Sequence, residues 1–370
     1  MSTLFSPISL GKLTLKNRIA IAPMCQYSAE DGAATSWHLM HLGHLALSGA
    51  GLLFIEATAV EPEGRISSMD LGLWSDATEH ALAGVLQAVR SHSSMPIAIQ
   101  LAHAGRKAST RVPWEGGKSI ASSAGGWRTY APSPVPFAEH DETPIALDAT
   151  GLRRVRDAFA AAARRADRLG IDAFELHAAH GYLLHEFLSP LANRRDDAYG
   201  GSLENRMRFP LQVFEAVREA VHPDKPVGIR VSATDWVEGG WDVEQTVVLA
   251  QELNKRGCAF IDVSSGGISP LQQIPLGPGY QVPFAERIRK AAGMPTIAVG
   301  LITETAQAED IVASGKADMV ALARGMLYNP RWPWHAAAQL GATVDAPPQY
   351  WRAQPREAKD LFDVARIAAR

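Results

Sequence analysis

The chain lacks most of the features that mark secreted, membrane or nucleic-acid-binding proteins. Only two cysteines, Cys25 and Cys258, occur among 370 residues, which excludes a disulfide framework. No stretch approaches about 20 uninterrupted apolar residues, and residues 1–10 lack the basic region and apolar run of a secretory signal. The net charge is −3, and no run of lysine and arginine could neutralise a line of phosphates. We therefore expect a cytoplasmic protein that binds neither a membrane nor a nucleic acid.

The glycine pattern of dinucleotide-binding folds, GxGxxG after the first strand, is also missing. The sequence instead contains eight short runs rich in Val, Ile, Ala and Leu. These runs are mostly apolar, as expected for parallel strands that are covered on both faces. They occupy residues 18–24, 51–60, 96–105, 172–181, 226–233, 260–267, 295–300 and 319–324.

Segments of helical period lie between these runs, most clearly at residues 149–169, 203–221, 242–256, 283–292 and 303–314. Asp148, Ser202 and Thr303 are expected to cap three of the helices. Eight βα units predict an α/β fold in which a single domain forms a closed (β/α)8 TIM barrel, because an open doubly wound sheet normally uses fewer units.

Two segments extend beyond the regular pattern. Residues 105–172 are too many for one helix, and we interpret most of them as a long loop over the barrel mouth. A tail rich in Pro and Trp follows the last helix, so we assign residues 1–345 to the barrel and 346–370 to the tail. The tail either wraps the barrel surface or reaches a neighbouring subunit.

Catalytic groups of such barrels lie where the strands end and in the loops just after them. The polar residues at these positions are Cys25, Tyr27, Thr58, Gln100, His103, His177, His180, Tyr182, Arg230 and Arg324. We expect many of these hydrogen-bonding groups to meet at one mouth of the barrel.

His177, His180 and Tyr182 form the densest cluster. Two histidines could ligate a metal, but zinc needs three or four ligands and no carboxylate lies among them. Both histidines could also be satisfied loop residues. Two N–H donors beside a phenol suit a substrate whose carbonyl must be polarised and whose carbon must be protonated. A phenol, with an unperturbed pKa of about 10, remains protonated at neutral pH.

Arg230 ends an otherwise apolar strand, where an arginine is unfavourable unless an anion meets it. That anion is Glu175 from the adjacent strand, the electron-rich edge of a reduced flavin, or both. Gly300 and the pair Ala323 and Arg324 stand at the ends of the seventh and eighth strands, where this fold commonly binds phosphate. Cys25 could be a nucleophile or a thiol that tunes a flavin's redox potential, whereas Cys258 is interpreted as a packing residue.

Four motifs together resemble the old yellow enzyme family, in its thermophilic-like or xenobiotic reductase subclass. They are APMCQY at 22–27, QLAHAGRK at 100–107, HAAHGYL at 177–183 and NRRDD at 193–197. The similarity extends from about Leu4 into the tail. It implies a flavoenzyme that binds FMN, is reduced by NADPH or NADH, and passes hydride to an activated alkene such as an enone, a maleimide or a nitroalkene. Nitro compounds and nitrate esters are further substrates implied by the family.

The resemblance also implies which residues form the site. With Gly300 added from its place in the fold, the residues assigned to FMN are Ala22, Pro23, Met24, Cys25, Ala57, Gln100, Arg230, Gly300, Ala323 and Arg324. His177 and His180 would bind the substrate oxygen, and Tyr182 would donate the proton. Tyr27 would shape the pocket. Cys25 stands where other members carry threonine, which favours the redox-tuning role.

The tail motif QYWR at 349–352 resembles one that places an arginine in the adjacent subunit's site, so Arg352 is a candidate substrate-binding residue of a homodimer or homotetramer. Two other functions stay open at this point. One is a metal-dependent hydrolase that uses the two histidines, although our expectation is no metal. The other is a catalytically silent relative that retains FMN.

Overall fold

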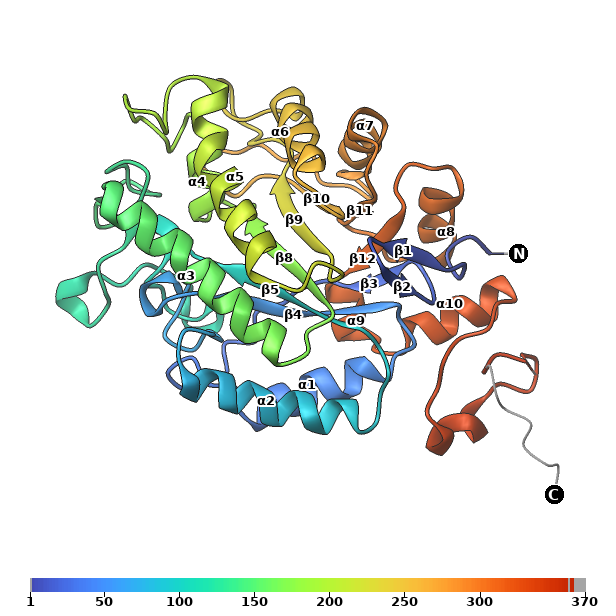
Figure 1. Cartoon of the computed structure of the whole chain (residues 1–370). Coiled ribbons are helices and arrows are strands. Elements are labelled where there is room, and N and C mark those ends of the chain that lie inside the picture. Colours follow the sequence, from blue (N-terminus) through green and yellow to red (C-terminus); the bar gives the residue numbers. More distant parts are fainter. Residues whose placement is uncertain (1, 359, 363–370) are drawn as a thin grey trace.

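The computed structural model describes residues 2–358 and 360–362. Its centre is a closed barrel of eight parallel strands (Figure 1). In order around the barrel they are β3 (Ile19–Ile21), β4 (Leu52–Ala59), β5 (Ile97–Ala102), β8 (Ala173–Ala178), β9 (Val227–Ser232), β10 (Ile261–Ser264), β11 (Thr296–Ala298) and β12 (Met319–Leu322). Each strand lies within one of the eight predicted runs, and the predicted (β/α)8 barrel is confirmed.

The amino end of the barrel is filled by apolar side chains. A hairpin of β1 (Ile8–Leu10) and β2 (Leu13–Leu15) places Leu10 and Leu15 in a buried cluster with Phe54 and Phe260. The rings of Phe54 and Phe260 meet edge to face at 6.2 Å. Because this end is filled by hydrocarbon, the polar strand residues are confined to the other end.

Helices surround the barrel (Figure 1). They are α1 (Ser36–Ala46), α2 (Asp76–Arg90), α3 (Ala149–Arg168), α4 (Leu183–Leu188), α5 (Leu203–Ala220), α6 (Val243–Lys255), α7 (Val282–Ala292), α8 (Thr305–Ala313), α9 (Arg324–Tyr328) and α10 (Trp332–Leu340). The five predicted helices correspond to α3, α5, α6, α7 and α8. Among the described residues, no helix combines the length and the hydropathy needed to cross a bilayer.

Two of the three predicted helix caps are confirmed. The side chains of Asp148 and Ser202 accept hydrogen bonds from backbone N–H groups in the first turns of α3 and α5. The prediction for Thr303 is wrong, because Glu304 occupies the cap position of α8 and makes no side-chain cap. The Thr303 hydroxyl donates instead to the Glu304 carboxylate at 3.3 Å.

The predicted long loop between β5 and α3 contains short pieces of regular structure. They are η2 (Gly105–Lys107), η3 (Pro113–Glu115), η4 (Ser122–Ala124), β6 (Tyr130–Ala131) and β7 (Ile145–Ala146). The ring of Trp114 in this loop lies 5.9 Å from the ring of Tyr27, edge to face. Arg106 donates to the backbone oxygens of Val135 and Pro136 at 3.2 and 3.3 Å. These contacts hold the loop against the carboxyl end of the barrel.

The tail packs beside α10, on the far side of the barrel from the loop after β8 (Figure 1). It contains η5 (Pro348–Ala353), and the ring of Trp334 lies 6.1 Å from that of Tyr350. Residues 359 and 363–370 of the predicted tail lie outside the described residues. The boundary after residue 345 stays a prediction.

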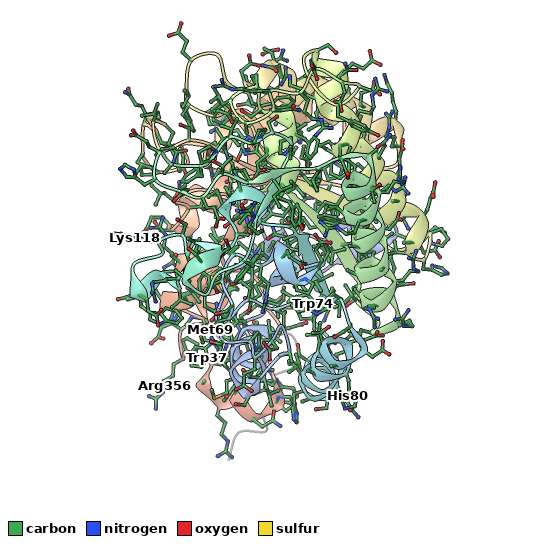
Figure 2. All side chains as sticks on the ribbon, turned by 90° about the vertical axis from the view of Figure 1, so that its left-hand side faces the viewer. Trp37, Met69, Trp74, His80, Lys118 and Arg356 are labelled. Atoms are coloured by element: carbon green, nitrogen blue, oxygen red, sulfur yellow. The ribbon has the colours of Figure 1, made fainter. Side chains whose placement is uncertain are left out.

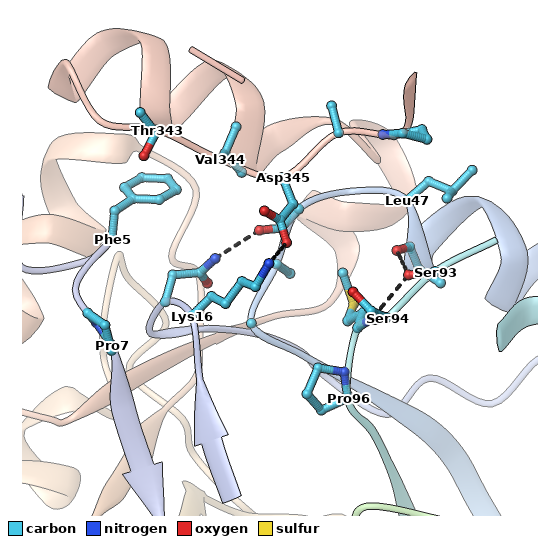
Figure 3. Close-up of a pocket in the computed structure, with 18 of the residues that line it drawn as sticks. Phe5, Pro7, Lys16, Leu47, Ser93, Ser94, Pro96, Thr343, Val344 and Asp345 are labelled. Carbon is cyan, nitrogen blue, oxygen red and sulfur yellow. Dashed lines mark hydrogen bonds and ion pairs between the residues drawn. The ribbon is translucent and has the colours of Figure 1, made fainter. Parts of the chain in front are cut away.

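A cavity of about 640 Å³ lies at the amino end of the barrel (Figure 3). Segments that precede β3, β4 and β5 line it together with residues 343–347. Lys16 and Asp345 form an ion pair of 2.5 Å at its edge, with side chains 68% and 44% exposed. Exposed pairs of this kind contribute little to stability. The cavity is remote from the strand ends that carry the candidate site.

Candidate active site

The strand register aligns three polar residues across the barrel mouth. His177 on β8 pairs with Arg230 on β9, which in turn pairs with Asp262 on β10. Arg230 Nε lies 3.3 Å from Asp262 Oδ2, and both residues are buried. The sequence analysis proposed Glu175 as the protein anion for Arg230, and this is wrong because the ion pair is made with Asp262. Asp262 was missed although it lies in a predicted strand next to that of Arg230.

Glu175 bonds in the opposite direction, toward β5. Gln100 donates from Nε2 to Glu175 Oε1 at 2.7 Å, and Glu175 is fully buried. Burial raises the pKa of Glu175 to about 8, with the Asp262 carboxylate adding to this effect and Arg230 opposing it. Glu175 is therefore mostly protonated at neutral pH.

A turn after β8 brings the three predicted rings together. The ring centroids of His177 and His180 are 5.1 Å apart and those of His177 and Tyr182 are 4.9 Å apart, both edge to face. His180 and Gly181 have φ values of 59° and 77°, in the left-handed region. A Cβ on Gly181 would lie 2.1 Å from the oxygen of Gly267, so only glycine fits there.

A hydrogen-bond network under the turn fixes its backbone. The N–H of Gly181 donates to His185 Nδ1 at 2.9 Å, which places the proton of that ring on Nε2. His185 Nε2 lies 2.9 Å from Asp235 Oδ1, and Asp235 also accepts from the hydroxyl of Ser189 at 2.6 Å. Neither residue was predicted from the sequence: His185 lies inside α4, and Asp235, although it lies in the loop after β9, belongs to no motif that marks it.

Both histidines of the mouth are uncharged. Burial lowers the pKa of His177 and of His180 well below the ordinary value, and the positive charges of Arg230 and Lys107 add to this effect. His177 Nδ1 accepts from the N–H of Ala179 at 3.3 Å, so the ring proton is on Nε2. His180 Nε2 lies 2.6 Å from Ser264 Oγ.

Cys25, Tyr27 and Tyr182 are also held in their neutral forms. Burial raises the pKa of each of the three groups well above its ordinary value, and the carboxylate of Asp70 adds to the effect on each. Glu56 adds to the effect on Cys25 and Tyr27. A protonated thiol is a poor nucleophile, so this environment disfavours the nucleophilic interpretation of Cys25.

Glu56 supports the segment that carries Cys25. It sits at an irregularity of β4, where the register with β5 shifts between Ile55 and Ala57. Its carboxylate accepts from the N–H of Gln26 at 2.9 Å and lies 3.3 Å from His38 Nε2. This buried carboxylate was not found from the sequence.

Closure of the barrel places the predicted phosphate-binding residues beside the segment at 22–25. The N–H of Ala22 donates to the oxygen of Leu322 at 3.0 Å, directly before Ala323 and Arg324. Arg324 begins α9 with an exposed side chain, and Ala323 offers no side-chain cap to the helix. Gly300 follows β11 with φ of 119°, and a Cβ there would meet Gln281 Nε2 at 2.7 Å.

Three strand-end or tail residues do not join the site in this chain. His103 is buried and its Nε2 lies 2.9 Å from Glu61 Oε1. Thr58 is buried and donates to the backbone oxygen of Glu56 at 2.8 Å. Arg352 is exposed on η5, whose neighbour Tyr350 packs on α10. Within residues 2–358 and 360–362, no three His, Cys, Asp or Glu side chains are grouped as metal ligands.

The closed parallel barrel gathers two neutral imidazoles and a phenol at the carboxyl ends of its strands, where TIM-barrel enzymes hold their active sites. The chain belongs to the NADH:flavin oxidoreductase / NADH oxidase family, whose sequence model matches residues 3–342. It is an FMN-dependent NAD(P)H oxidoreductase of the old yellow enzyme type. The predicted family, enzyme class and cofactors are thereby confirmed.

Known proteins resemble the chain over almost its full length. It is 46% identical over 353 residues to an NADPH dehydrogenase of Geobacillus thermodenitrificans, covering 95% of this chain and 98% of that protein. It is 44% identical over 355 residues to an NADPH dehydrogenase of Listeria innocua, covering 95% and 99%. The structure of morphinone reductase superposes with a TM-score of 0.76 at 32% identity, covering 94% of this chain and 92% of that one.

The protonated state of Cys25 can be tested by alkylation. Only the thiolate attacks iodoacetamide, and the pKa of Cys25 is raised. We expect Cys25 in the folded protein to react at least roughly tenfold more slowly at pH 8 than glutathione in the same tube, since an ordinary thiol has a pKa of about 8.5. Mass spectrometry of the peptide that carries Cys25 gives the rate, and the urea-unfolded chain is the control. A rate at or above that of glutathione would establish Cys25 as an activated nucleophile.

Proposed function

We propose that this oxidoreductase is an ene-reductase that acts on enones, maleimides and nitroalkenes, and that also reduces nitro compounds or nitrate esters. When bound, FMN accepts hydride from NAD(P)H and supplies it to the β carbon of the alkene. The observation that carries the proposal is the set of two neutral imidazoles and a protonated phenol, with ring centroids 5.1 and 4.9 Å apart at one mouth. Such a set can bind an oxygen and protonate a neighbouring carbon.

The residues at the mouth fit FMN in charge and in place. Buried Arg230 Nε makes no hydrogen bond, although it lies beside Asp262, and its charge suits the electron-rich edge of a reduced ring. The exposed cation of Arg324 at the start of α9 suits a phosphate. We assign the ring to the segment Ala22, Pro23, Met24 and Cys25, with Ala57 and Gln100 at its polar edge and Gly300 and Ala323 near the phosphate.

Neutral histidines supply the hydrogen bonds to the substrate oxygen. His177 donates from Nε2, because its Nδ1 already accepts from Ala179. His180 donates from Nδ1 in the tautomer whose Nε2 accepts from the hydroxyl of Ser264 at 2.6 Å; the other acceptor near that hydroxyl is Gln281 Oε1 at 3.4 Å. Two neutral donors polarise the carbonyl or nitro group and stabilise negative charge that develops on its oxygen.

Tyr182 supplies the proton to the α carbon. Burial raises the pKa of its phenol, so Tyr182 stays protonated until a strongly basic carbon forms beside it. Tyr27, whose ring contacts Trp114 of the long loop, forms a wall of the pocket. The neutral thiol of Cys25 adjusts the redox potential by a weak hydrogen bond.

We also propose that the protein forms a homodimer or homotetramer in which Arg352 enters a neighbouring subunit's site. Large apolar side chains are exposed on α1 and α9, with Trp37 47%, Met40 59% and Tyr328 94% exposed. Figure 2 shows Trp37 and Met69 on the lower part of one face of the molecule. Trp37 Nε1 donates to Gln26 Oε1 at 3.0 Å, so this face adjoins the mouth of the barrel. Exposed apolar patches of this kind mark interaction surfaces.

The role of Tyr182 predicts a selective defect. In Tyr182→Phe, flavin reduction by NADPH should change less than about twofold, whereas oxidation of the reduced flavin by 2-cyclohexenone should slow by roughly 100-fold or more, because a general acid contributes 10²–10⁴-fold. Stopped-flow absorbance of the flavin measures both steps. Tyr199→Phe is the control, since its hydroxyl bonds to Gln212 outside the mouth at 3.3 Å. Equal slowing of both steps would refute the proton-donor role.

Arg324 should hold the phosphate of FMN. Loss of hydrogen bonds to a charged group removes about 1.5–3 kcal/mol, so Arg324→Ala should bind FMN roughly 10- to 100-fold more weakly. Fluorescence titration of the apoprotein with FMN measures this, and riboflavin should bind both proteins equally because it lacks the phosphate. Arg287→Ala, which removes an exposed arginine paired with Glu244, is the matched control. Unchanged FMN affinity would place the phosphate elsewhere.

The shared-site proposal is tested at the tail. A chain that ends after Ala346 should show a smaller particle mass in light scattering, a higher KM for 2-cyclohexenone, or both. A chain that ends after Phe362 keeps η5 and Arg352 and should behave as the full chain does. If the shorter chain retains both the mass and the KM of the full chain, Arg352 does not serve a neighbouring subunit.

A further inference from the structure

Lys107 joins several segments around the histidine pair. It lies at the end of η2, is partly buried, and donates from Nζ to the backbone oxygens of His180 and Gly267 at 2.8 and 3.0 Å. The same Nζ lies 4.6 Å from the ring centroid of Phe137 and 5.2 Å from that of Tyr182. Within the described part of the chain no ion pair joins it to a carboxylate. The ammonium therefore contacts the β8 turn, the loop after β10 and the long loop together.

The two backbone oxygens belong to a tight and unusual junction. His180 and Gly267 both have left-handed φ values, 59° and 96°. They pack so closely that a Cβ on Gly267 would lie 2.4 Å from the Cα of His180. Two carbonyl oxygens that converge on one point need a shared donor, because unsatisfied carbonyls away from water are unfavourable. Lys107 is that donor, so its removal should release the backbone of His180.

The charge of Lys107 is poorly compensated. Burial lowers its pKa to about 8, Arg106 adds to this lowering, and Glu186 opposes it. Glu186 itself accepts from the N–H of Arg106 at 2.8 Å, and burial raises its pKa to about 8. With a pKa of about 8, Lys107 still carries its charge at pH 7, and no ion pair among the described residues joins it to Glu186. The positive charge acts on His177 and His180, whose pKa values it lowers further.

We propose that Lys107 is a positioning residue of the alkene half-reaction: it fixes the backbone of His180 and directs a positive charge at the oxygen that the two imidazoles hold. The inference rests on the proposed ene-reductase function. Negative charge grows on that oxygen as hydride reaches the β carbon, and a nearby fixed cation stabilises it. The same charge keeps His177 unprotonated, so that its Nδ1 continues to accept from Ala179. Lys107 takes no part in the proton transfer, which runs from Tyr182 to the α carbon.

Three variants separate the charge of Lys107 from its structural contacts. Lys107→Met removes the charge and the donors, whereas Lys107→Arg keeps a cation at every pH tested. Lys118→Met is the matched control, because Lys118 lies in the same long loop with an exposed side chain (Figure 2). Each FMN-loaded protein is reduced with dithionite and mixed anaerobically with 2-cyclohexenone from pH 5.5 to 9.5. FMN content and the thermal midpoint report whether each variant is folded.

The expected results have a definite pattern. At pH 7, the reduced flavin of Lys107→Met should be oxidised roughly tenfold or more slowly than that of the parent, because a fixed charge beside the developing oxyanion is lost, and that of Lys118→Met within about twofold of the parent rate. The parent rate should fall as pH rises through about 8, where Lys107 loses its charge. The rate of Lys107→Arg should stay level there. On the acid side, the rate of Lys107→Met should begin to fall at a higher pH than the parent rate, because loss of the cation raises the histidine pKa values.

Other outcomes would overturn the inference. A fall near pH 8 that persists in Lys107→Arg would belong to Glu186 or Glu175, whose pKa values also lie at about 8. If Lys107→Met is slow at every pH and its rate changes with pH in parallel with the parent rate, Lys107 is only a structural contact. If Lys107→Met fails to retain FMN, the proposal is decided by the pH profiles of the other two proteins. The parent rate should fall near pH 8, and the rate of Lys107→Arg should stay level there. Failure of every protein, including Lys118→Met, to be oxidised by any activated alkene would instead refute the proposed function.

Discussion

Pairing of the last barrel strand with the first brings together residues about 300 positions apart. Val320, Ala321 and Leu322 of β12 align with Ile19, Ala20 and Ile21 of β3. Because parallel strands share one direction, this pairing sets the chain after residue 21 beside the chain after residue 322. The segment at 22–25, assigned to the flavin ring, thus lies beside Arg324, assigned to the phosphate. The two segments are therefore placed side by side by the pairing of β12 with β3.

The mouth is divided into two electrostatic halves, and each half holds its neighbours uncharged. Arg230 and Lys107 lie on the side of the histidines, where positive charge disfavours protonation of an imidazole. Asp70 and Glu56 lie on the side of Cys25 and Tyr27, where negative charge disfavours loss of a proton, and Tyr182 stands between the two sides, next to His177 and Lys107. Burial acts in the same direction on both sides. The proposed hydrogen-bond donors and the proposed proton source are thereby kept uncharged at neutral pH.

The residues that could be predicted from the sequence follow rules that operate within one strand or one motif. Apolar runs located all eight strands, and the strand-end rule found His177, His180, Tyr182 and Arg230. The rule also selected Thr58 and His103, which are satisfied inside the protein, because a strand end does not determine which way a side chain turns. Lys107 could not be found in this way, since its proposed positioning role rests on two backbone oxygens that only the folded loops bring together. The partner of Arg230, Asp262, follows from the register between β9 and β10. The apolar pattern of a single strand does not reveal that register.

Chemistry and selectivity are carried by different parts of the chain. The proposed donors lie at strand ends and on the turn after β8. Buried hydrogen bonds of His185 and Asp235 fix the backbone of this turn and so the positions of the donors. Trp114 and Phe137, whose rings contact Tyr27 and Lys107, belong to the long loop, which Arg106 attaches through backbone oxygens of Val135 and Pro136. Backbone contacts of this kind place little restriction on the side chains of the loop. If the proposed ene-reductase function holds, substitutions in the loop that leave Phe137 and Arg106 intact can change which substrate fits without moving the residues on the strand ends.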